Sequence, residues 1–270
     1  MPRDSRYDIL FETIKIGPVT AKNRFYQAPH CNGMGRKFPS GMAAMRGVKA
    51  EGGWAVVSTE QVDIHPSSDI TPSADGRLWS DQDIPYLARM CDAIHEHDAL
   101  ASIELVHNAH LSANLYSREV PISTTSMPAI DFNAPVQARA MDKADIKAYR
   151  RWHLDAVKRA KQAGFDIINC YVGHDSTLPG MFMLNRYNFR TDEYGGSLKN
   201  RVRLFRETIE ETKDAVGDTM GVVVRFSVEE LRGAEGREHD KEGREIIELL
   251  AELPDLWDVN VSEWDNDSMT

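Results

Sequence analysis

Residues 163–171, with the sequence AGFDIINCY, decide the fold of this chain. Before them, from Asp142 onward, apolar residues recur at every third or fourth position, which is the spacing of one helix face. Gly164 is a residue type that commonly ends a helix, and the run behind it is largely apolar rather than alternating. Such a run is typical of a parallel strand that is buried on both faces. The stretch therefore predicts a helix that leads directly into a buried strand.

The same pairing of helix and strand continues in both directions along the chain. A hairpin is expected at 13–21, and strands are expected at 24–28, 54–59, 100–106, 165–171, 221–226 and 257–264. Helices are expected to end at Gly52-Gly53 and Gly217, to begin near Asp83 and Asp142, and to precede the last strand. Strands separated by helices pair in parallel, and no G-x-G-x-x-G follows any of them, which argues against a dinucleotide-binding sheet. The pattern thus predicts an α/β fold of about six βα units.

The composition argues against several classes of function. The chain has 270 residues, a formal net charge of −10 and no run of Lys or Arg, whereas a nucleic-acid surface needs clustered cations. No apolar stretch approaches the ~20 residues of a membrane span. The first residues lack the apolar segment of a signal peptide, so a cytoplasmic protein is expected. The cysteines Cys31, Cys91 and Cys170 form no C-x-x-C pair, so the sequence indicates no zinc site, iron–sulfur site or disulfide framework.

Polar residues follow or end every expected strand. In a parallel barrel, functional groups gather at the carboxyl ends of the strands, so these residues would face one mouth. In chain order, the residues at these strand ends are Pro29, His30, Cys31, Glu60, Gln61, Glu104, His107, His110, Tyr171, His174, Arg225, Glu263, Trp264 and Asp267.

Several histidines, cysteines and charged residues also have a structural interpretation. His107 and His110 have the spacing of a metal pair, but no third ligand can be identified, and no metal site is expected. Cys91 and Cys170 fall in apolar segments and are expected to pack in the core. Arg225 directly follows three valines. Because burying a lone cation is expensive, Arg225 must be paired or meet an anionic ligand.

Four stretches of the sequence resemble a known family. They are NRFYQAPHC at 23–31, KAEGGW at 49–54, AGFDI at 163–167 and the highly specific NFRTDEYGGSLKNR at 188–201. They resemble the trimethylamine, dimethylamine and histamine dehydrogenase group of the old yellow enzyme superfamily. The similarity extends from Asp8 to the end of the chain. The resemblance implies a (β/α)8 TIM barrel that holds FMN.

The resemblance also implies which residues bind the flavin. Cys31 matches the cysteine that, in this group, forms a thioether to C6 of FMN. Pro29, Glu104 and Arg225 match positions that hold the flavin. A cation such as Arg225 near the ring would stabilise the negative charge that develops there on reduction.

Other residues match the substrate side of the site. Tyr171, His174 and Asp267 match a catalytic trio, and Trp264 matches an aromatic wall of the substrate site. Gln61 departs from the pattern, because trimethylamine dehydrogenase has a tyrosine there as part of a cage that attracts a cationic amine by up to ~2 kcal/mol. An amide instead suits a substrate with an N–H, so Gln61 resembles the dimethylamine and histamine enzymes and implies a small amine substrate.

The implied reaction is the oxidative dehydrogenation of an amine to an imine, which water hydrolyses. Electrons would leave through an iron–sulfur cluster to an electron-transfer protein, and the enzyme would be a homo-oligomer. Thr270 lies just past the sixth expected strand. Residues 1–270 are therefore expected to be the N-terminal portion of one FMN-binding barrel domain, with two βα units, the cluster site and further domains downstream. Two alternatives stay open, namely an FMN-dependent ene or dienoyl reductase that uses NAD(P)H, and a non-catalytic fragment.

Overall fold

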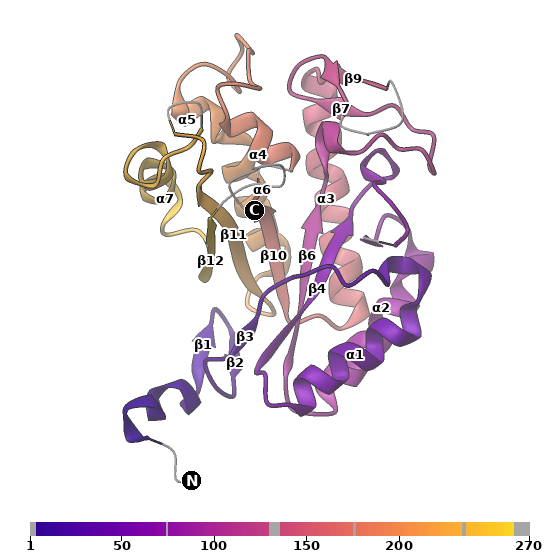
Figure 1. The fold of residues 1–270 in the computed structure, drawn as a ribbon, viewed down its shortest axis with the longest axis vertical. Coiled ribbons are helices and arrows are strands. Elements are labelled where there is room, and N and C mark those ends of the chain that lie inside the picture. The colour runs from indigo at the N-terminus through magenta and orange to yellow at the C-terminus, as the bar shows by residue number, and fades with distance from the viewer. Residues whose placement is uncertain (1–3, 74, 130–135, 175–176, 234–235, 262–270) are drawn as a thin grey trace.

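The central element is a parallel sheet that curls like part of a barrel wall (Figure 1). The computed structural model describes residues 4–73, 75–129, 136–174, 177–233 and 236–261. The sheet consists of β3 (Tyr26–Gln27), β4 (Val56–Asp63), β6 (Leu100–Val106), β10 (Ile167–Val172), β11 (Gly221–Glu229) and β12 (Leu256–Val261), all paired in parallel. The short β5 (Gly76–Arg77) pairs with the carboxyl end of β4.

The strand order decides between the two parallel architectures. From β3 to β12, each main strand lies beside the next one along the chain. A doubly wound sheet would reverse this order at a switch point, whereas a TIM-barrel wall grows in one direction with a helix after each strand. The predicted α/β fold, an incomplete TIM barrel of about six βα units, is therefore confirmed.

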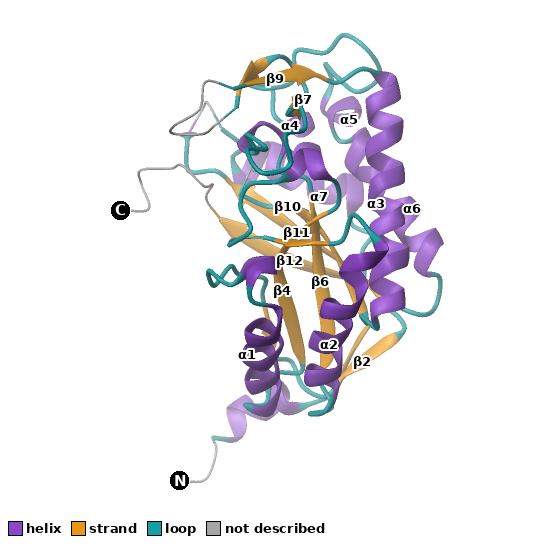
Figure 2. Ribbon diagram, turned by 90° about the vertical axis from the view of Figure 1, so that its right-hand side faces the viewer, coloured by secondary structure: helices purple, strands orange, loops and turns teal. Residues whose placement is uncertain are grey.

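Helices connect the strands and cover the outer face of the sheet (Figure 2). The long ones are α1 (Pro39–Glu51), α2 (Ile84–His95), α3 (Lys143–Ala163) and α6 (Arg203–Val216), which pack side by side in that order. Shorter helices are α4 (Leu178–Met183), α5 (Leu198–Arg201) and α7 (Arg244–Leu250). Short helical turns lie at Ser5–Phe11, Gly35–Lys37, Pro66–Ser68, Asp81–Asp83, Ala109–Leu111 and His239–Gly243.

The unit at 142–171 forms through local interactions that the sequence predicts. The Asp142 side chain accepts a hydrogen bond from the Asp145 N–H, and the Asp145 side chain returns one in a capping box that begins α3. Gly164 ends the helix with a φ of 96°, a left-handed conformation that glycine adopts without strain. Every residue of β10 is buried, as expected for a strand covered on both faces.

Apolar side chains pack on both faces of the sheet. The larger cluster lies between the sheet and the helices and includes Cys91 and Cys170, which are buried as predicted. The smaller cluster consists of Ile16, Ala21, Ala55, Val56, Ile167 and Val223. It packs the predicted hairpin, β1 (Ile14–Ile16) and β2 (Val19–Ala21), against the amino ends of the strands. The hairpin therefore lies at the end of the barrel opposite the predicted site.

The structure differs from the expectation at several element boundaries. The first strand is shorter than 24–28. The second starts at Val56 and extends to Asp63, because a bulge between Ser58 and Gln61 realigns it with β6. A small sheet of β7 (Ile122–Ser123), β8 (Met127–Pro128) and β9 (Gln137–Ala140) was not predicted, since strands this short carry no clear periodicity. Residues 262–264 of the sixth expected strand lie outside the described residues.

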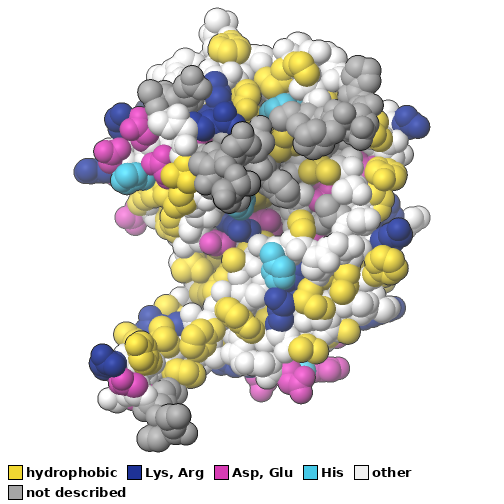
Figure 3. Space-filling model, viewed as in Figure 1, with side chains coloured by type: hydrophobic (Ala, Val, Ile, Leu, Met, Phe, Trp, Pro, Cys, Tyr) yellow, Lys and Arg dark blue, Asp and Glu magenta, His cyan; other side chains and the backbone are white. Residues whose placement is uncertain are grey.

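The surface carries charges of both signs, which are interspersed on the face shown in Figure 3. Tyr7, Ile9 and Phe11, in the helical turn before β1, are exposed apolar side chains. Within the described ranges, no helix combines the length and the apolar character needed to cross a membrane.

Candidate active site

Arg225 lies at the centre of the polar residues that meet at the carboxyl ends of the strands. Its Nη1 donates to the Pro29 carbonyl oxygen at 2.9 Å and to the Glu104 carboxylate at 3.2 Å. Its Nε lies 3.5 Å from the Asp258 carboxylate, and its guanidinium carbon lies 5.6 Å from the centre of the Tyr171 ring. The cation is therefore paired, as its position after three valines requires.

Burial and charge together set the protonation of this group. Burial raises the pKa of Glu104 to about 7, although the neighbouring Arg225 cation lowers it. Burial likewise raises the pKa of Asp258 against the attraction of Arg225. Burial alone would lower the pKa of Arg225, but the attraction of the two carboxylates and the tyrosine outweighs it, and the pKa is raised. Arg225 therefore stays cationic, while Glu104 can exchange a proton near neutral pH.

Tyr171 and His174 form a hydrogen-bonded pair beside this cation. The Tyr171 hydroxyl oxygen lies 2.5 Å from Nδ1 of His174, and the His174 backbone N–H donates to Ser227 Oγ at 2.7 Å. Burial, and then the charge of Arg225, lower the pKa of His174 to about 4. A neutral imidazole accepts at one nitrogen and donates at the other, so Nδ1 accepts the tyrosine proton in the Nε2–H tautomer. Asp267, the third predicted member of the trio, lies outside the described residues.

The turn after β10 places the imidazole on the tyrosine hydroxyl. His174 has a φ of 56°, which is uncommon for a residue with a side chain. At Gly173, a Cβ would lie 2.7 Å from the Tyr171 ring and 2.9 Å from the Asn260 amide oxygen. Only glycine therefore fits between these two side chains.

Cys31 is an exposed residue in the loop after β3. Partial burial of its thiol raises the pKa of Cys31 to about 12, and the Asp75 and Glu60 carboxylates add to the shift. Thiolates are stabilised by nearby cations or helix amino ends, whereas these surroundings are acidic. The thiol is therefore protonated near neutral pH.

Gln61 reaches the same region from β4. It is almost fully buried, and its Nε2 donates to the Asp75 carboxylate. The bulge in β4 sets Gln61 opposite Glu104 on β6. Trp264, the other predicted substrate-binding residue, lies outside the described residues.

Arg46 belongs to this region, although the sequence analysis did not single it out. It lies fully buried in α1 and donates to Gln27 Oε1 at 3.0 Å and to the His30 carbonyl oxygen at 2.9 Å. Its Nη2 lies 3.3 Å from the Glu60 carboxylate. The sequence contains a signal that identifies Arg46. Arg46 lies at helical spacing from the buried residues of α1, and a cation on a buried helix face needs partners. Arg46 thereby holds the segment that leads to Cys31.

His107 and His110 make packing contacts. Nε2 of His107 lies 2.9 Å from Ser67 Oγ, and burial lowers the pKa of His107 to about 3. Its ring lies parallel to that of Trp152, and the His110 ring lies 5.3 Å from that of Tyr187. Among the residues that the structure describes, no group of three or more His, Cys, Asp or Glu side chains is placed to hold a metal ion.

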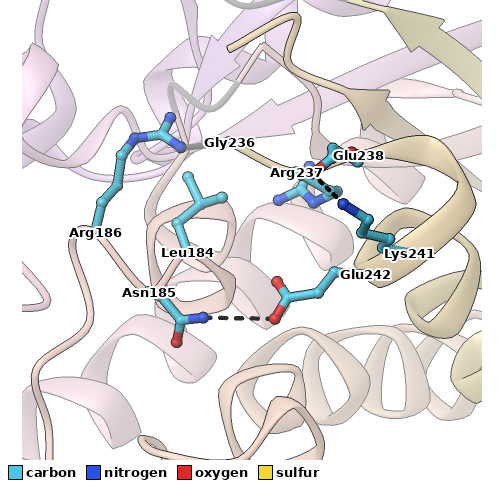
Figure 4. Close-up of a pocket in the computed structure, with 8 residues that line it drawn as sticks. All are labelled: Leu184, Asn185, Arg186, Gly236, Arg237, Glu238, Lys241 and Glu242. Atoms are coloured by element: carbon cyan, nitrogen blue, oxygen red, sulfur yellow. Dashed lines mark hydrogen bonds and ion pairs between the residues drawn. The ribbon is translucent and has the colours of Figure 1, made fainter. Parts of the chain in front are cut away.

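A separate pocket of ≈ 340 Å³ lies between the segments that follow β10 and β11 (Figure 4). It is lined by Leu184, Asn185, Arg186, Gly236, Arg237, Glu238, Lys241 and Glu242. Lys241 bonds to Glu238 at 2.7 Å, and Asn185 contacts Glu242 at 3.5 Å, which joins the two segments. None of the lining residues belongs to the predicted site, so we assign this pocket no ligand.

The residues around Arg225 fit a planar ring with polar edges, such as the isoalloxazine of FMN. Arg225 supplies a fixed cation, and Glu104 supplies a carboxyl that can donate or accept. Both side-chain amide atoms of Asn260 are buried and have no hydrogen-bond partner among the described residues. Buried amides normally find such partners, and Gly173 leaves room beside Asn260 because it lacks a Cβ. Together these groups could bond the donors and acceptors along one edge of a flavin.

Known proteins resemble this chain over nearly its whole length. Dimethylamine dehydrogenase from Hyphomicrobium sp. (strain x) is 38% identical over 281 residues, which cover 99% of this chain and 37% of that protein. The structure of 6-hydroxypseudooxynicotine amine oxidase from Pseudomonas geniculata N1 is 50% identical, with a TM-score of 0.94 over 97% of this chain and 39% of that one. The structure of histamine dehydrogenase from Rhizobium sp. 4-9 is 51% identical, with a TM-score of 0.92 over 96% of this chain and 38% of that one.

The chain thus spans less than two fifths of the length of each of these proteins. The resemblance to dimethylamine and histamine dehydrogenases, which the four sequence stretches predict, is confirmed. Residues 9–268, nearly the whole chain, match the model of one flavoprotein family. This chain belongs to the NADH:flavin oxidoreductase / NADH oxidase family.

Proposed function

We propose that the chain provides the FMN-binding and catalytic part of a flavin-dependent amine dehydrogenase, which oxidises a small amine to an imine that water hydrolyses to an aldehyde. The observation that carries the proposal is the Tyr171–His174 pair beside the Arg225 cation at one barrel mouth. The similarity to two amine dehydrogenases and an amine oxidase supports the same activity.

Pro29, Glu104 and Arg225 would hold the flavin. When bound, FMN would supply the acceptor for a hydride from the carbon next to the amine nitrogen. Arg225 would balance the negative charge of the reduced ring, and its own contacts to Pro29 and Glu104 hold the guanidinium in place. Cys31, which follows Pro29 by two residues, would attach the flavin covalently.

Tyr171 and His174 would control the proton on the substrate nitrogen. A small amine is protonated near neutral pH and must lose a proton before it can give up a hydride. In the Nε2–H tautomer, the neutral His174 accepts the tyrosine hydroxyl proton, and the hydroxyl oxygen would then act as an acceptor for the N–H of the substrate. The Arg225 cation beside the pair disfavours a second positive charge and so would favour the neutral form of the amine. Asp267 would complete this group.

Gln61 and Trp264 would set the choice of amine. The Gln61 amide offers a hydrogen bond rather than an aromatic face, so the preferred substrate is a primary or secondary amine. Trp264 would supply one apolar wall for its alkyl groups.

We further propose that residues 1–270 are the N-terminal portion of one eight-stranded FMN-binding domain. In the described sheet, β3 and β12 are the terminal strands of the order, and a TIM barrel closes when eight strands complete the ring. In this proposal, two more βα units lie between β12 and β3. Electrons would pass through an iron–sulfur cluster elsewhere in a longer protein to an electron-transfer protein, and the enzyme would be a homo-oligomer.

Anaerobic mixing experiments test the activity. The purified flavoprotein is mixed with dimethylamine, histamine, trimethylamine or NADH, and the flavin absorbance is followed by stopped flow. We expect a primary or secondary amine to bleach the flavin faster than NADH does. Rapid bleaching by NADH with none by any amine would instead identify a reductase, and protein that purifies without flavin would favour a non-catalytic fragment.

A further inference from the structure

We propose that Asp75 fixes the orientation of the Gln61 side-chain amide and thereby makes the site select amines that carry an N–H. This inference rests on the proposed amine dehydrogenase function. Asp75 is a positioning residue in this scheme, because Asp75 touches Gln61 and Gln61 would touch the substrate.

Asp75 is held rigidly where it meets Gln61. It is fully buried and immediately precedes β5, which pairs with β4 one residue beyond Gln61, at Val62 and Gly76. The Asp75 backbone N–H donates to the Thr71 carbonyl oxygen at 3.2 Å, and the Asp75 carbonyl oxygen accepts from the Arg36 N–H at 2.9 Å. One carboxylate oxygen accepts from Gln61 Nε2, and the other accepts from the Thr71 N–H at 3.3 Å. The carboxylate therefore cannot turn away from the amide.

The chemistry of a carboxylate decides which end of the amide it binds. An ionised carboxylate can only accept hydrogen bonds, whereas an amide has a donor end and an acceptor end. Asp75 therefore holds Nε2 of Gln61 and directs Oε1 to the other side. From the described residues, no hydrogen bond reaches Oε1. That oxygen is the group left to accept an N–H from a substrate, and a neutral tertiary amine has none to offer.

The surrounding charges determine when Asp75 is ionised. Burial raises the pKa of Asp75 to about 7, while the hydrogen bond from Gln61 and the Arg36 cation lower it and Glu60 raises it. Burial and Asp75 together raise the pKa of the nearby Asp63 well above its usual value. The charge on Asp75 therefore disfavours ionisation of Asp63, and at pH 8.5, above its own pKa, Asp75 carries the charge.

The test compares variants of two buried carboxyls, Asp75 and Asp63, in the holoenzyme at pH 8.5. Asp75→Asn replaces the carboxylate by an amide whose oxygen should keep accepting the Thr71 N–H, so its NH2 faces Gln61 and should turn Gln61 Oε1 toward residue 75. Asp63→Asn is the matched control, since Asp63 is equally buried but accepts from Ser68 and Asn108 instead. The readout is the second-order rate constant of anaerobic flavin reduction by dimethylamine, divided by that for trimethylamine and normalised to bound flavin.

We expect Asp75→Asn to lower this ratio by roughly tenfold to a hundredfold, the range for one buried hydrogen bond that is lost. Asp63→Asn should keep the wild-type ratio, and Asp75→Asn should change nothing further in a Gln61→Met background. An unchanged ratio in Asp75→Asn, with reduction intact, would overturn this inference alone. No reduction of the wild-type flavin by any amine would overturn the proposed function and this inference with it.

A second measurement needs no variant and applies if Asp75→Asn does not fold. In a crystal structure of the wild-type holoenzyme, reduced and soaked with dimethylamine, the amine nitrogen should lie within hydrogen-bond distance of Gln61 Oε1. An amine nitrogen bonded elsewhere, or Oε1 turned toward Asp75, would overturn the inference.

Discussion

Replacing Arg225 by methionine removes the charge but keeps a long side chain at the barrel mouth. The arginine side chain is 13% exposed and lies 3.2 Å from the Glu104 carboxylate, which is 3% exposed. Removing one partner of a buried ion pair leaves the other charge uncompensated and costs about 3–5 kcal/mol. We therefore expect Arg225→Met to lower the free energy of unfolding by about this amount at pH 8.5.

The loss should depend on pH in a defined direction. Burial holds the pKa of Glu104 at about 7 in the fold, above its ordinary value of 4.5. A carboxyl whose pKa is higher in the folded than in the unfolded protein lowers the free energy of unfolding as the pH rises from the unfolded pKa to the folded pKa. Arg225 lowers the pKa of Glu104 in the folded protein, so this pKa should be higher in the variant. The free energy of unfolding of the variant should therefore keep falling above pH 7, by up to ~1.4 kcal/mol per pH unit. Below pH 7, Glu104 is mostly neutral in the folded protein, and the loss should fall toward the ~1–2 kcal/mol of the missing hydrogen bonds.

Pulse proteolysis in urea, from pH 5.5 to 8.5, measures this loss on flavin-free protein in a Cys31→Ser background. The control is Arg225→Met combined with Glu104→Gln, which removes the buried carboxylate and should recover most of the pH-dependent part. A loss of equal size at both ends of the pH range, or a double variant no more stable than the single one, would refute the reasoning.

Four further changes test other parts of the structure. Cys31→Ser should release the flavin into the supernatant on acid precipitation, whereas the wild type should keep its colour; free FMN from the wild type would contradict covalent attachment. His174→Gln should slow single-turnover flavin reduction by about 10²–10⁴-fold per bound flavin, and normal rates in its holoenzyme would end the catalytic assignment. Gln61→Tyr should raise the rate with trimethylamine relative to dimethylamine, by up to ~30-fold for a desolvated cation–π contact; an unchanged ratio would place specificity elsewhere. Asp142→Ala removes the side-chain cap of α3 and should cost ~1 kcal/mol in urea unfolding, so an unaltered midpoint would argue against the capping box.

The sequence by itself determined the parts of this protein that depend on local interactions. The helix at 143–163 begins at its capping aspartate and ends at Gly164 because both signals act within a few residues. The buried strands were predictable from their continuous apolar runs, and the position of Arg225 after three valines required a partner. The roles of the flavin-binding and catalytic candidates, by contrast, came from resemblance to known enzymes, because the pattern of polar residues at the strand ends locates these residues but assigns no role to them.

Tertiary structure alone decided how those residues meet. Arg225 and Pro29 are 196 residues apart in the chain, yet they share a hydrogen bond. The order of the strands separated a barrel from a doubly wound sheet, and the bulge in β4 set Gln61 opposite Glu104. The Asp75–Gln61 bond likewise depends on the pairing of β5 with β4, and the burial of Arg46 depends on how α1 packs. Strand register and helix packing place these side chains through contacts that span the whole sheet, so neighbouring residues in the sequence carry no record of them.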